Sequence, residues 1–211
     1  MVEIFVPYRV YQNCAVACEY RGGKVQSDLL AEDKFTDELN TRGFVTLTGE
    51  REKSETRPQA SFIFVIIAPE SSSTNRSQDF KKLVKSVVPK RTVTGPRTEV
   101  MLVADQDIKY LINDTEDVQV YRDNNIYLYG YKHNHFLFEL PKYASTPQYR
   151  LATAEEKTTI HSKFYVPASN LPTLKVTDPT NEWYGFDRGS VLRAESLSET
   201  AGKSSWWCVV K

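Results

Sequence analysis

The chain has 211 residues, with 27 basic side chains against 27 acidic ones. This balance excludes a protein that holds nucleic acid by overall positive charge, so any DNA contact has to be local. The longest apolar run, residues 62–68, is far shorter than the ~20 residues that span a bilayer, and no signal peptide is visible. We therefore expect a soluble, intracellular protein that has no membrane partner.

Three cysteines, Cys14, Cys18 and Cys208, make an odd number without a regular disulfide framework, which favours a reducing compartment. The spacing of Cys14 and Cys18 would place both on one helix face, where they could form half of a metal site. Small buried side chains explain them more simply. We predict no bound metal and no cofactor.

The first 142 residues predict an α/β unit. Within the first 50 residues the pattern indicates one helix, from Leu29 to Leu39, which Gly43 would end. Residues 50–61 contain a single apolar side chain, Ala60, and predict a solvent-exposed loop. Residues 62–68 are continuously apolar and rich in β-branched side chains, as expected of a strand buried on both faces.

A helix is predicted after this strand, because apolar residues recur there every three or four positions. These positions are Phe80, Leu83, Val84, Val87 and Val88, while Lys81, Lys82 and Lys85 fall on the exposed face. Residues 100–104 predict a second buried strand, parallel to the first through a right-handed crossover. Residues 118–121 and 126–131 flank a polar turn at 122–125 and predict a β-hairpin.

Two helix starts are visible in the last third of the chain. Thr153 and Glu156 form a capping box that begins a helix toward Phe164. Asp178 followed by Pro179 begins a second, short helix, because Asp accepts backbone N–H bonds as N-cap and Pro at the first helical position has no N–H to leave unpaired.

The second helix is expected to end at Gly185. A turn that includes Gly189, where positive φ is allowed, then leads into a strand at 190–195, and another strand at 206–210 finishes the chain. Trp206 and Trp207 could stack on bases. In a terminal strand, however, one is expected in the core and its neighbour at a surface or interface.

Two further patterns suggest metal chemistry. His133 and His135 would point to the same side of a strand, but no third ligand stands at a recognisable spacing, so a polar strand end explains them better. Asp107 and Lys109, with Asp105 or Glu99 as companion, could form the acidic site of a metal-dependent nuclease. The same triplet pattern recurs three more times in the chain, and Asp107 and Lys109 lie beyond the apolar strand. We therefore predict no catalytic residue and keep a free-standing nuclease or DNA-processing protein as the alternative.

The tail carries more specific signals than turns and caps require. It resembles the C-terminal assembly domain of the fifth common subunit of eukaryotic nuclear RNA polymerases and the corresponding small subunit of archaeal RNA polymerase. The matching segments stand in the family's order and at its spacings: 171–174, 178–179, 184–185, 188–191 and 198–202. Upstream, residues 135–140, Pro147 and 153–156 resemble the family's first strand and first helix. The chain departs from the family at Ser196-Leu197, where Arg-Pro is usual, and at 203–207, where the relatives are richer in Tyr and Arg.

The resemblance implies two domains, a jaw-like α/β domain at 1–142 with a mainly parallel or mixed sheet and a small α+β assembly domain at 143–211. It implies a noncatalytic polymerase subunit that docks on the largest subunit and on neighbouring subunits, and that does not form a homo-oligomer. The residues expected at that interface are Asp178, Pro179, Gly185, Arg188, Gly189, Glu199 and Thr200.

The resemblance also implies that the first domain projects toward downstream duplex DNA. Residues 76–97 carry seven basic side chains against one acid, and such a segment can contact phosphates weakly and without reading sequence. The residues expected nearest to DNA are Lys81, Lys82, Lys85, Lys90 and Arg91. An acidic segment, 103–107, replaces the family's Thr-Pro-Ser-Ala loop.

The first domain departs far from the cellular pattern while the tail does not, as is typical of polymerase subunits of large DNA viruses. We accordingly expect a viral source, with the protein in the virion and the host cytoplasm. A cellular source would place it in the nucleus.

Overall fold

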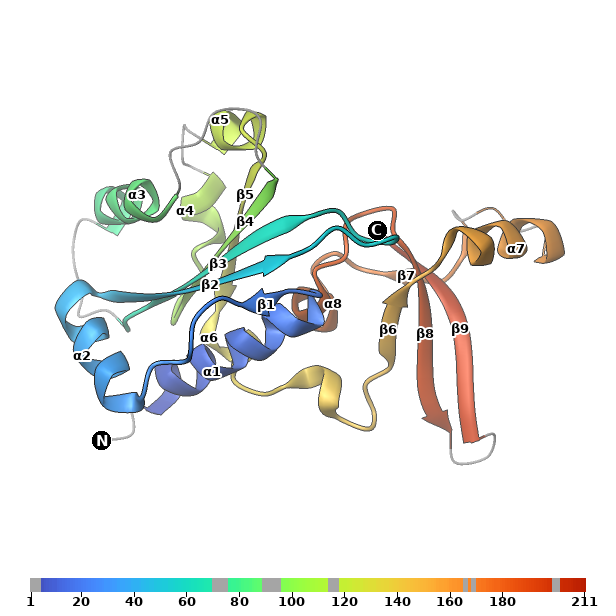
Figure 1. Cartoon of the computed structure of the whole chain (residues 1–211), viewed down its shortest axis with the longest axis horizontal. Helices are drawn as coiled ribbons and strands as arrows, with labels where there is room; N and C mark the ends of the chain where they lie inside the picture. The colour runs from blue at the N-terminus through green and yellow to red at the C-terminus, as the bar shows by residue number, and fades with distance from the viewer. Residues whose placement is uncertain are drawn as a thin grey trace. The chain divides into compact units, whose positions relative to one another are not determined.

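A computed structural model describes residues 5–69, 76–88, 96–113, 118–164, 167, 170–198 and 202–211 (Figure 1). The chain divides into two units. The first is formed by Met1–Lys53 and Pro58–Phe138, and the second by Ser54–Arg57 and Glu139–Lys211. Each unit has its own sheet, so the predicted mixed α/β and α+β fold class is confirmed.

The first unit is built on a five-stranded mixed sheet in the order β1-β2-β3-β4-β5. β1, β2 and β3 pair antiparallel, whereas β3, β4 and β5 run parallel, as predicted for the first two apolar strands. The strands are β1 Lys24–Val25, β2 Phe44–Arg51, β3 Ala60–Ile67, β4 Arg97–Ala104 and β5 Ile126–Lys132.

Helices cover both faces of this sheet, α3, α4 and α5 on one face and α1 and α6 on the other (Figure 1). α2 packs beside α1 and β2. The helices are α1 Phe5–Tyr20, α2 Glu32–Arg42, α3 Arg76–Val87, α4 Lys109–Asn113, α5 Val118–Asp123 and α6 His133–Phe136.

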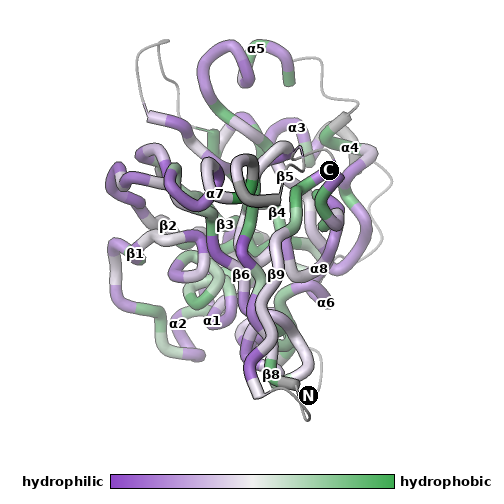
Figure 2. The backbone as a smooth tube through the Cα atoms, turned by 90° about the vertical axis from the view of Figure 1, so that its right-hand side faces the viewer, coloured by the Kyte–Doolittle hydropathy of each residue, from purple (hydrophilic) through white to green (hydrophobic). Residues whose placement is uncertain are grey.

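The two layers follow from the alternation of side chains along the strands. Val65, Val100 and Leu102 face α3 and α4, where Phe80, Val84, Ile108 and Ile112 complete an apolar cluster. Phe64 points to the other face and meets Phe136 of α6 edge to face, with ring centroids 6.3 Å apart. The backbone trace is correspondingly most apolar along β3 and β4 (Figure 2).

α1 lies close against β2 because Gly49 has no side chain. A Cβ at this position would stand 2.4 Å from Sγ of Cys18. Cys14 and Cys18 share α1 and are fully buried, and burial raises the pKa of the Cys18 thiol to about 11. Both cysteines therefore act as small packing side chains, as expected.

The predicted hairpin at 118–131 is wrong. Residues 118–123 form the helix α5, and β5 pairs in parallel with β4. Val118 and Tyr121 stand three positions apart, so both pack on the apolar cluster from one helix face. Asn125, with φ 60°, reverses the chain between α5 and β5.

Several boundaries also differ from the predictions. The helix expected at 29–39 spans 32–42, although Gly43 does end it. Residues 50–51 and 60–61, expected in a loop, extend β2 and β3, and Arg51 and Ala60 are buried. α1 was not predicted as an element.

His133 and His135 belong to the helix α6 and do not share a strand face. His133 is 2% exposed, and burial lowers its pKa, whereas His135 is half-buried and packs against the Tyr131 ring. Phe136 is buried in the core, and residues 135–140, expected to resemble a strand, do not form one.

A buried ion-pair network ties α1 to the sheet. Nη1 of Arg21 lies 2.8 Å from Oε2 of Glu99, and Nε of Arg97 lies 2.9 Å from Oε1 of the same carboxylate. The Arg21 and Glu99 side chains are 2% and 3% exposed. Nη1 of Arg51 donates to the carbonyl oxygen of Arg21 at 2.8 Å, which fixes the C-terminal end of α1.

The second unit has a four-stranded sheet in the order β6-β8-β9-β7. β8 pairs antiparallel with both β6 and β9, and β7 runs parallel to β9. The elements are the 3₁₀ helix η1 Leu140–Lys142, β6 Gln148–Leu151, α7 Ala154–Phe164, β7 Thr173–Leu174, α8 Pro179–Tyr184, β8 Val191–Ser198 and β9 Gly202–Val210. The predicted helices and last two strands are confirmed, and both strands are longer than predicted.

α7 covers one face of this sheet. Ile160 of α7 packs with Ala152 and Val191, and Trp207 of β9 packs against the same group. Trp206 and Trp207 are both half-buried, so neither is fully in the core, contrary to expectation.

The capping box at the start of α7 is formed as predicted. The backbone N–H of Glu156 donates to Oγ1 of Thr153 at 3.2 Å, and the N–H of Thr153 donates to Oε2 of Glu156 at 2.9 Å. Nη1 and Nη2 of Arg150 also donate to the Glu156 carboxylate, and Nη1 of Arg193 lies 3.4 Å from Oε1 of Glu156. The Arg150 hydrogen bonds lower the pKa of Glu156 to about 2.

We predict that Glu99→Ala destabilises the first unit by about 3–5 kcal/mol, because it leaves the Arg21 charge buried without its carboxylate. Urea unfolding of the full chain, followed by far-UV circular dichroism, measures this loss. Arg42→Ala removes an exposed ion pair with Glu38 and should cost less than about 1 kcal/mol. Equal losses in the two variants would contradict a structural role for the buried network.

We also predict a pH-dependent contribution of Glu156. Its folded pKa, about 2, lies below the ordinary 4.5, so its contribution is complete above about pH 4.5 and is lost as the pH falls through 2. In the Glu156→Gln variant the side chain can still form the capping box. It has no carboxylate to protonate, so the acid-sensitive contribution is lost.

Tryptophan fluorescence during urea unfolding reports on the second unit, because all three tryptophans lie in it. The wild-type protein should lose more stability between about pH 6 and about pH 3 than Glu156→Gln, and Glu155→Gln should behave like the wild type. Equal acid sensitivity in all three proteins would show that the Arg150–Glu156 contact contributes nothing.

Candidate functional site

The α8 segment carries most of the residues that the sequence analysis selected for partner contact. Asp178 is the N-cap, in an extended conformation, and its Oδ1 accepts the N–H of Thr180 at 2.9 Å. Pro179 occupies the first helical position, as predicted. These two residues set where α8 begins and leave Pro179 exposed.

Two glycines set the path of the chain after α8. Gly185 has φ 62°, and its N–H donates to the carbonyl oxygen of Asn181 at 2.7 Å, which ends the helix. Gly189 has φ 85°, and its N–H donates to the carbonyl oxygen of Val210 at 2.8 Å. A side chain would strain both positions, because non-glycine residues rarely adopt positive φ.

Asn181 fixes both ends of this segment, although the sequence analysis did not select it. Its Nδ2 donates to the carbonyl oxygens of Val176 and Phe186, at 3.1 and 3.2 Å. Its Oδ1 accepts the N–H of Phe186 at 3.3 Å, and the residue is 3% exposed. An Asn in the middle of a short helix is itself a signal, because its side chain competes with helical hydrogen bonds unless it has other partners.

Arg57 completes the C-terminal end of α8 from a distant part of the sequence. Its Nη1 donates to the carbonyl oxygen of Tyr184 at 3.2 Å, and its guanidinium carbon lies 4.8 Å from the centroid of the Phe186 ring. A cation at this end also complements the helix dipole. No local pattern around Arg57 could have predicted this contact.

Around these fixed points lies an exposed surface, which we call the α8 surface. It consists of Lys175, Val176, Thr177, Pro179, Asp187, Arg188 and Gly189. Its two loops are brought together by the end of β9, since Val176 donates to the carbonyl oxygen of Lys211 and Gly189 to that of Val210. Arg188 has no ion pair with any residue that the structure describes, and its charge is available to a partner.

The predicted interface residues that the structure describes lie in α8 and in the turn between α8 and β8. Ser198 pairs with Gly202 at one end of the β8–β9 hairpin, whereas Val191 pairs with Val209 at the other end, next to Arg188. Seven residues of strand separate the two ends by about 23 Å. Glu199 and Thr200 lie outside the described residues, beside Ser198.

The residues proposed to lie near DNA are located on α3. Lys82 and Lys85 are exposed, Lys81 is half-buried, and Nζ of Lys82 lies 3.5 Å from Oδ1 of Asp79. Lys90 and Arg91 lie outside the described residues. Lys82 and Lys85 therefore give α3 an exposed basic side, on which the Lys82 charge is partly balanced by Asp79.

Among the candidate nuclease residues, Glu99 lies apart from the other three. Glu99 lies near the start of β4 and holds Arg21 and Arg97, while Asp105 follows the end of this strand, about 20 Å away at ~3.3 Å per residue. Oδ1 of Asp107 accepts the N–H of Lys109 at 3.0 Å and so caps α4. Among the described residues, no group of three His, Cys, Asp or Glu side chains could hold a metal ion.

Two other findings concern the described residues: the state of one thiol and the length of the helices. Burial raises the pKa of the Cys208 thiol to about 11, so this thiol is protonated near neutral pH. Over the same part of the chain, none of the helices combines the length and apolar character that crossing a membrane requires.

Comparison with known proteins places the second unit in a family. The family model described as RNA polymerase Rpb5, C-terminal domain, matches residues 138–210. Subunit Rpo5 of a DNA-directed RNA polymerase from Methanosarcina acetivorans is 30% identical over 73 residues, which are 35% of this chain and 94% of that protein.

Eukaryotic relatives match over a similar length. Subunit rpabc1 of DNA-directed RNA polymerases I, II and III from Dictyostelium discoideum is 29% identical over 82 residues, or 39% of this chain and 42% of that subunit. The Caenorhabditis elegans subunit RPABC1 is 31% identical over 78 residues, or 35% of this chain and 37% of that subunit. The match thus spans less than half of these eukaryotic subunits but nearly all of the archaeal one. Because the archaeal subunit is matched at 30% identity over 94% of its length, the chain belongs to the Rpb5 family of RNA polymerase subunits.

Proposed function

We propose that the chain is a noncatalytic subunit of a DNA-directed RNA polymerase that docks on the largest subunit through its proposed second domain, 143–211. The observations that support this most strongly are the match to the archaeal Rpo5, which covers 94% of that protein, and the match of the family model to residues 138–210. A relative that consists almost entirely of this module carries the name of a polymerase subunit. The module by itself is therefore the best candidate for the part that assembles with the polymerase.

The α8 surface is suited to this docking. Asp178, Asn181 and Gly185 use their hydrogen bonds internally and hold the loops in place, so little conformational entropy is lost when a partner binds. Arg188 is exposed and can form a bidentate pair with a carboxylate of the partner. The proposed interface also includes Glu199 and Thr200.

The proposed first domain, 1–142, would lie near downstream duplex DNA. The support is the basic face of α3, with Lys81, Lys82 and Lys85, to which Lys90 and Arg91 would add. Contacts of this kind neutralise phosphates and do not read bases. Its role in transcription would be to position the DNA.

The noncatalytic assignment is supported by the contacts of two acidic residues, Glu99 and Asp107. Glu99 is bound by two arginines and Asp107 caps α4, so neither carboxylate resembles a free metal ligand. We therefore do not favour the nuclease alternative. The relatives named above are cellular, and the viral source expected from the divergent first domain stays a prediction.

Incorporation into polymerase tests the docking surface. Arg188→Ala combined with Glu199→Ala should reduce co-purification of the largest subunit with the tagged full chain, because truncating one partner of a buried charge pair costs about 2–5 kcal/mol. Glu155→Ala with Lys157→Ala removes one acid and one base from the exposed side of α7 and is the matched control. If the Arg188 and Glu199 variant is incorporated into polymerase as well as the control variant, these two side chains do not belong to the interface.

Salt dependence tests the DNA contact. In assembled polymerase, changing Lys81, Lys82 and Lys85 to Gln should weaken binding to every downstream sequence and flatten the plot of log affinity against log salt by about 0.9 per lost contact. A polymerase with Lys24, Lys34 and Lys53 changed to Gln is the control, since these lysines are exposed outside α3. If the α3 variant keeps the wild-type slope and footprint, its lysines are only solvated.

A further inference from the structure

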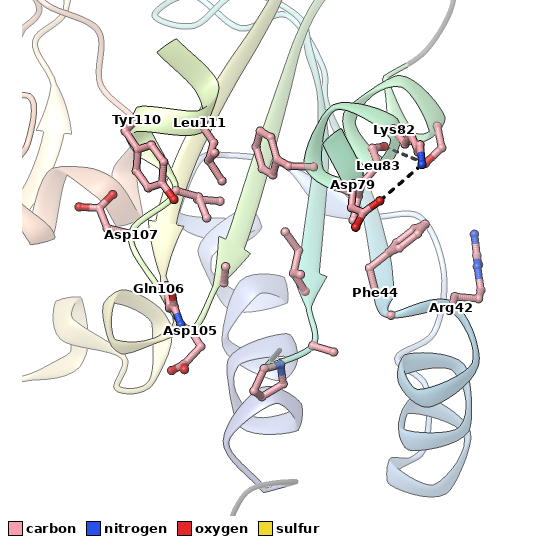
Figure 3. A pocket seen from close by; sticks show the side chains of 18 residues that line it. Arg42, Phe44, Asp79, Lys82, Leu83, Asp105, Gln106, Asp107, Tyr110 and Leu111 are labelled. Atoms are coloured by element: carbon pink, nitrogen blue, oxygen red, sulfur yellow. Dashed lines mark hydrogen bonds and ion pairs between the residues drawn. The ribbon is translucent and has the colours of Figure 1, made fainter. Parts of the chain in front are cut away.

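The first unit contains a cavity that the polymerase assignment does not use. It has a volume of about 590 Å³ and lies at the carboxyl ends of the parallel strands β3 and β4, between α3 and α4 (Figure 3). Ligand sites in open α/β sheets commonly lie at this edge, and ligand pockets have volumes of about 300–1,000 Å³. The size and position of the cavity therefore fit a binding site.

The walls of the cavity are largely apolar. Small residues at the strand ends, Ala68 and Ala104, leave space that Phe44, Leu83 and Ile108 surround. Several of these side chains extend the apolar cluster of the first unit to the surface. An occupant would therefore bury an apolar group here.

The mouth of the cavity is acidic. Asp105 and Asp107 are exposed on one side of the opening, Asp107 near Tyr110 and Asp105 near Gln106, and neither forms an ion pair with a residue in the described part of the chain (Figure 3). The two cations of the opposite wall already have carboxylate partners, Arg42 with Glu38 and Lys82 with Asp79. The charge left for an occupant is negative, which favours a cation and disfavours a phosphate.

Tyr110 marks the opening as a contact surface for protein. Its side chain is 59% exposed, although it stands between the buried residues Ile108 and Leu111. Tyrosine is enriched at protein interfaces, because it combines a large apolar ring with a hydrogen-bonding hydroxyl. A peptide that places an apolar side chain in the cavity would cover this ring and bring neighbouring basic residues to Asp105 and Asp107.

We propose that this cavity binds a peptide segment of a partner protein, in which a large apolar anchor residue is flanked by Lys or Arg. The anchor fills the apolar space, Tyr110 packs on the peptide, and the two aspartates pair with its basic residues. This peptide site shares no residue with the α8 surface, so the proposal can be tested separately from assembly with polymerase.

Selection of a random phage-displayed peptide library on the full chain tests the proposal. Enriched peptides should carry an apolar or aromatic residue flanked by Lys or Arg, and binding of the synthetic peptides is then measured by fluorescence anisotropy. Asp105→Asn with Asp107→Asn removes the acidic charge, and Asn at 107 retains the ability to cap α4. Its affinity for the peptides should fall about three- to tenfold at low salt and less at high salt.

Tyr110→Ala should weaken the same peptides by about tenfold or more, the effect of losing a central aromatic contact. Phe138→Ala is the matched control, because Phe138 is also 59% exposed in the first unit but does not line the cavity. Asp28→Asn with Asp33→Asn is the control for charge. Both controls should bind as the wild type does, and melting curves verify that each variant is folded.

Three results would overturn the proposal. The first is a failure to enrich any basic, apolar sequence. The second is enriched peptides that bind the Asp105 and Asp107 variant and the Tyr110 variant as tightly as the wild type. The third is an oligonucleotide whose binding Tyr110→Ala weakens and Asp105→Asn with Asp107→Asn strengthens, which would identify the cavity as a nucleic-acid site.

Discussion

The side-chain amide of Asn181 is the contact on which the proposed assembly surface depends. It binds the carbonyl oxygens of Val176 and Phe186 and the N–H of Phe186, and so joins the loop before α8 to the turn after it. Such an amide, 3% exposed, cannot be replaced by an apolar group without leaving backbone groups unpaired. The position of Arg188, two residues beyond Phe186, follows from these three bonds and from the turn at Gly185.

The first unit depends on a different kind of constraint. Glu99 pairs with Arg21, the residue that follows α1, and with Arg97 of its own strand. Burying the Arg21 and Glu99 charges is tolerated because the two groups lie within hydrogen-bonding distance of each other. This network holds α1 on one face of the sheet, while the opposite face supports α3 and α4. The basic face of α3 and the acidic cavity mouth, two surfaces of opposite charge, thus share one scaffold.

Sequence reasoning succeeded where structure is determined locally. The caps at Asp178 and Thr153 were predicted because each is formed within three residues, and the apolar runs of β3 and β4 indicated buried strands. It failed at 118–123, where a short apolar run fits helix and strand equally well, and the parallel partner of β5 decides the outcome. Asn181 and Arg57 were missed for a related reason, since their partners belong to other segments brought near by the fold. The family resemblance supplied the assignment of the tail, which composition and periodicity alone do not give.

Cross-linking mass spectrometry of the complex purified with the tagged full chain tests the central claim most directly. Lys175 belongs to the α8 surface, and Lys211 is exposed next to it, where its carbonyl oxygen accepts the N–H of Val176. The account predicts that the largest polymerase subunit co-purifies and that these two lysines form cross-links to it. Recovery of the chain free of polymerase subunits, or cross-links to the largest subunit only from first-unit lysines such as Lys24 and Lys34, would contradict it.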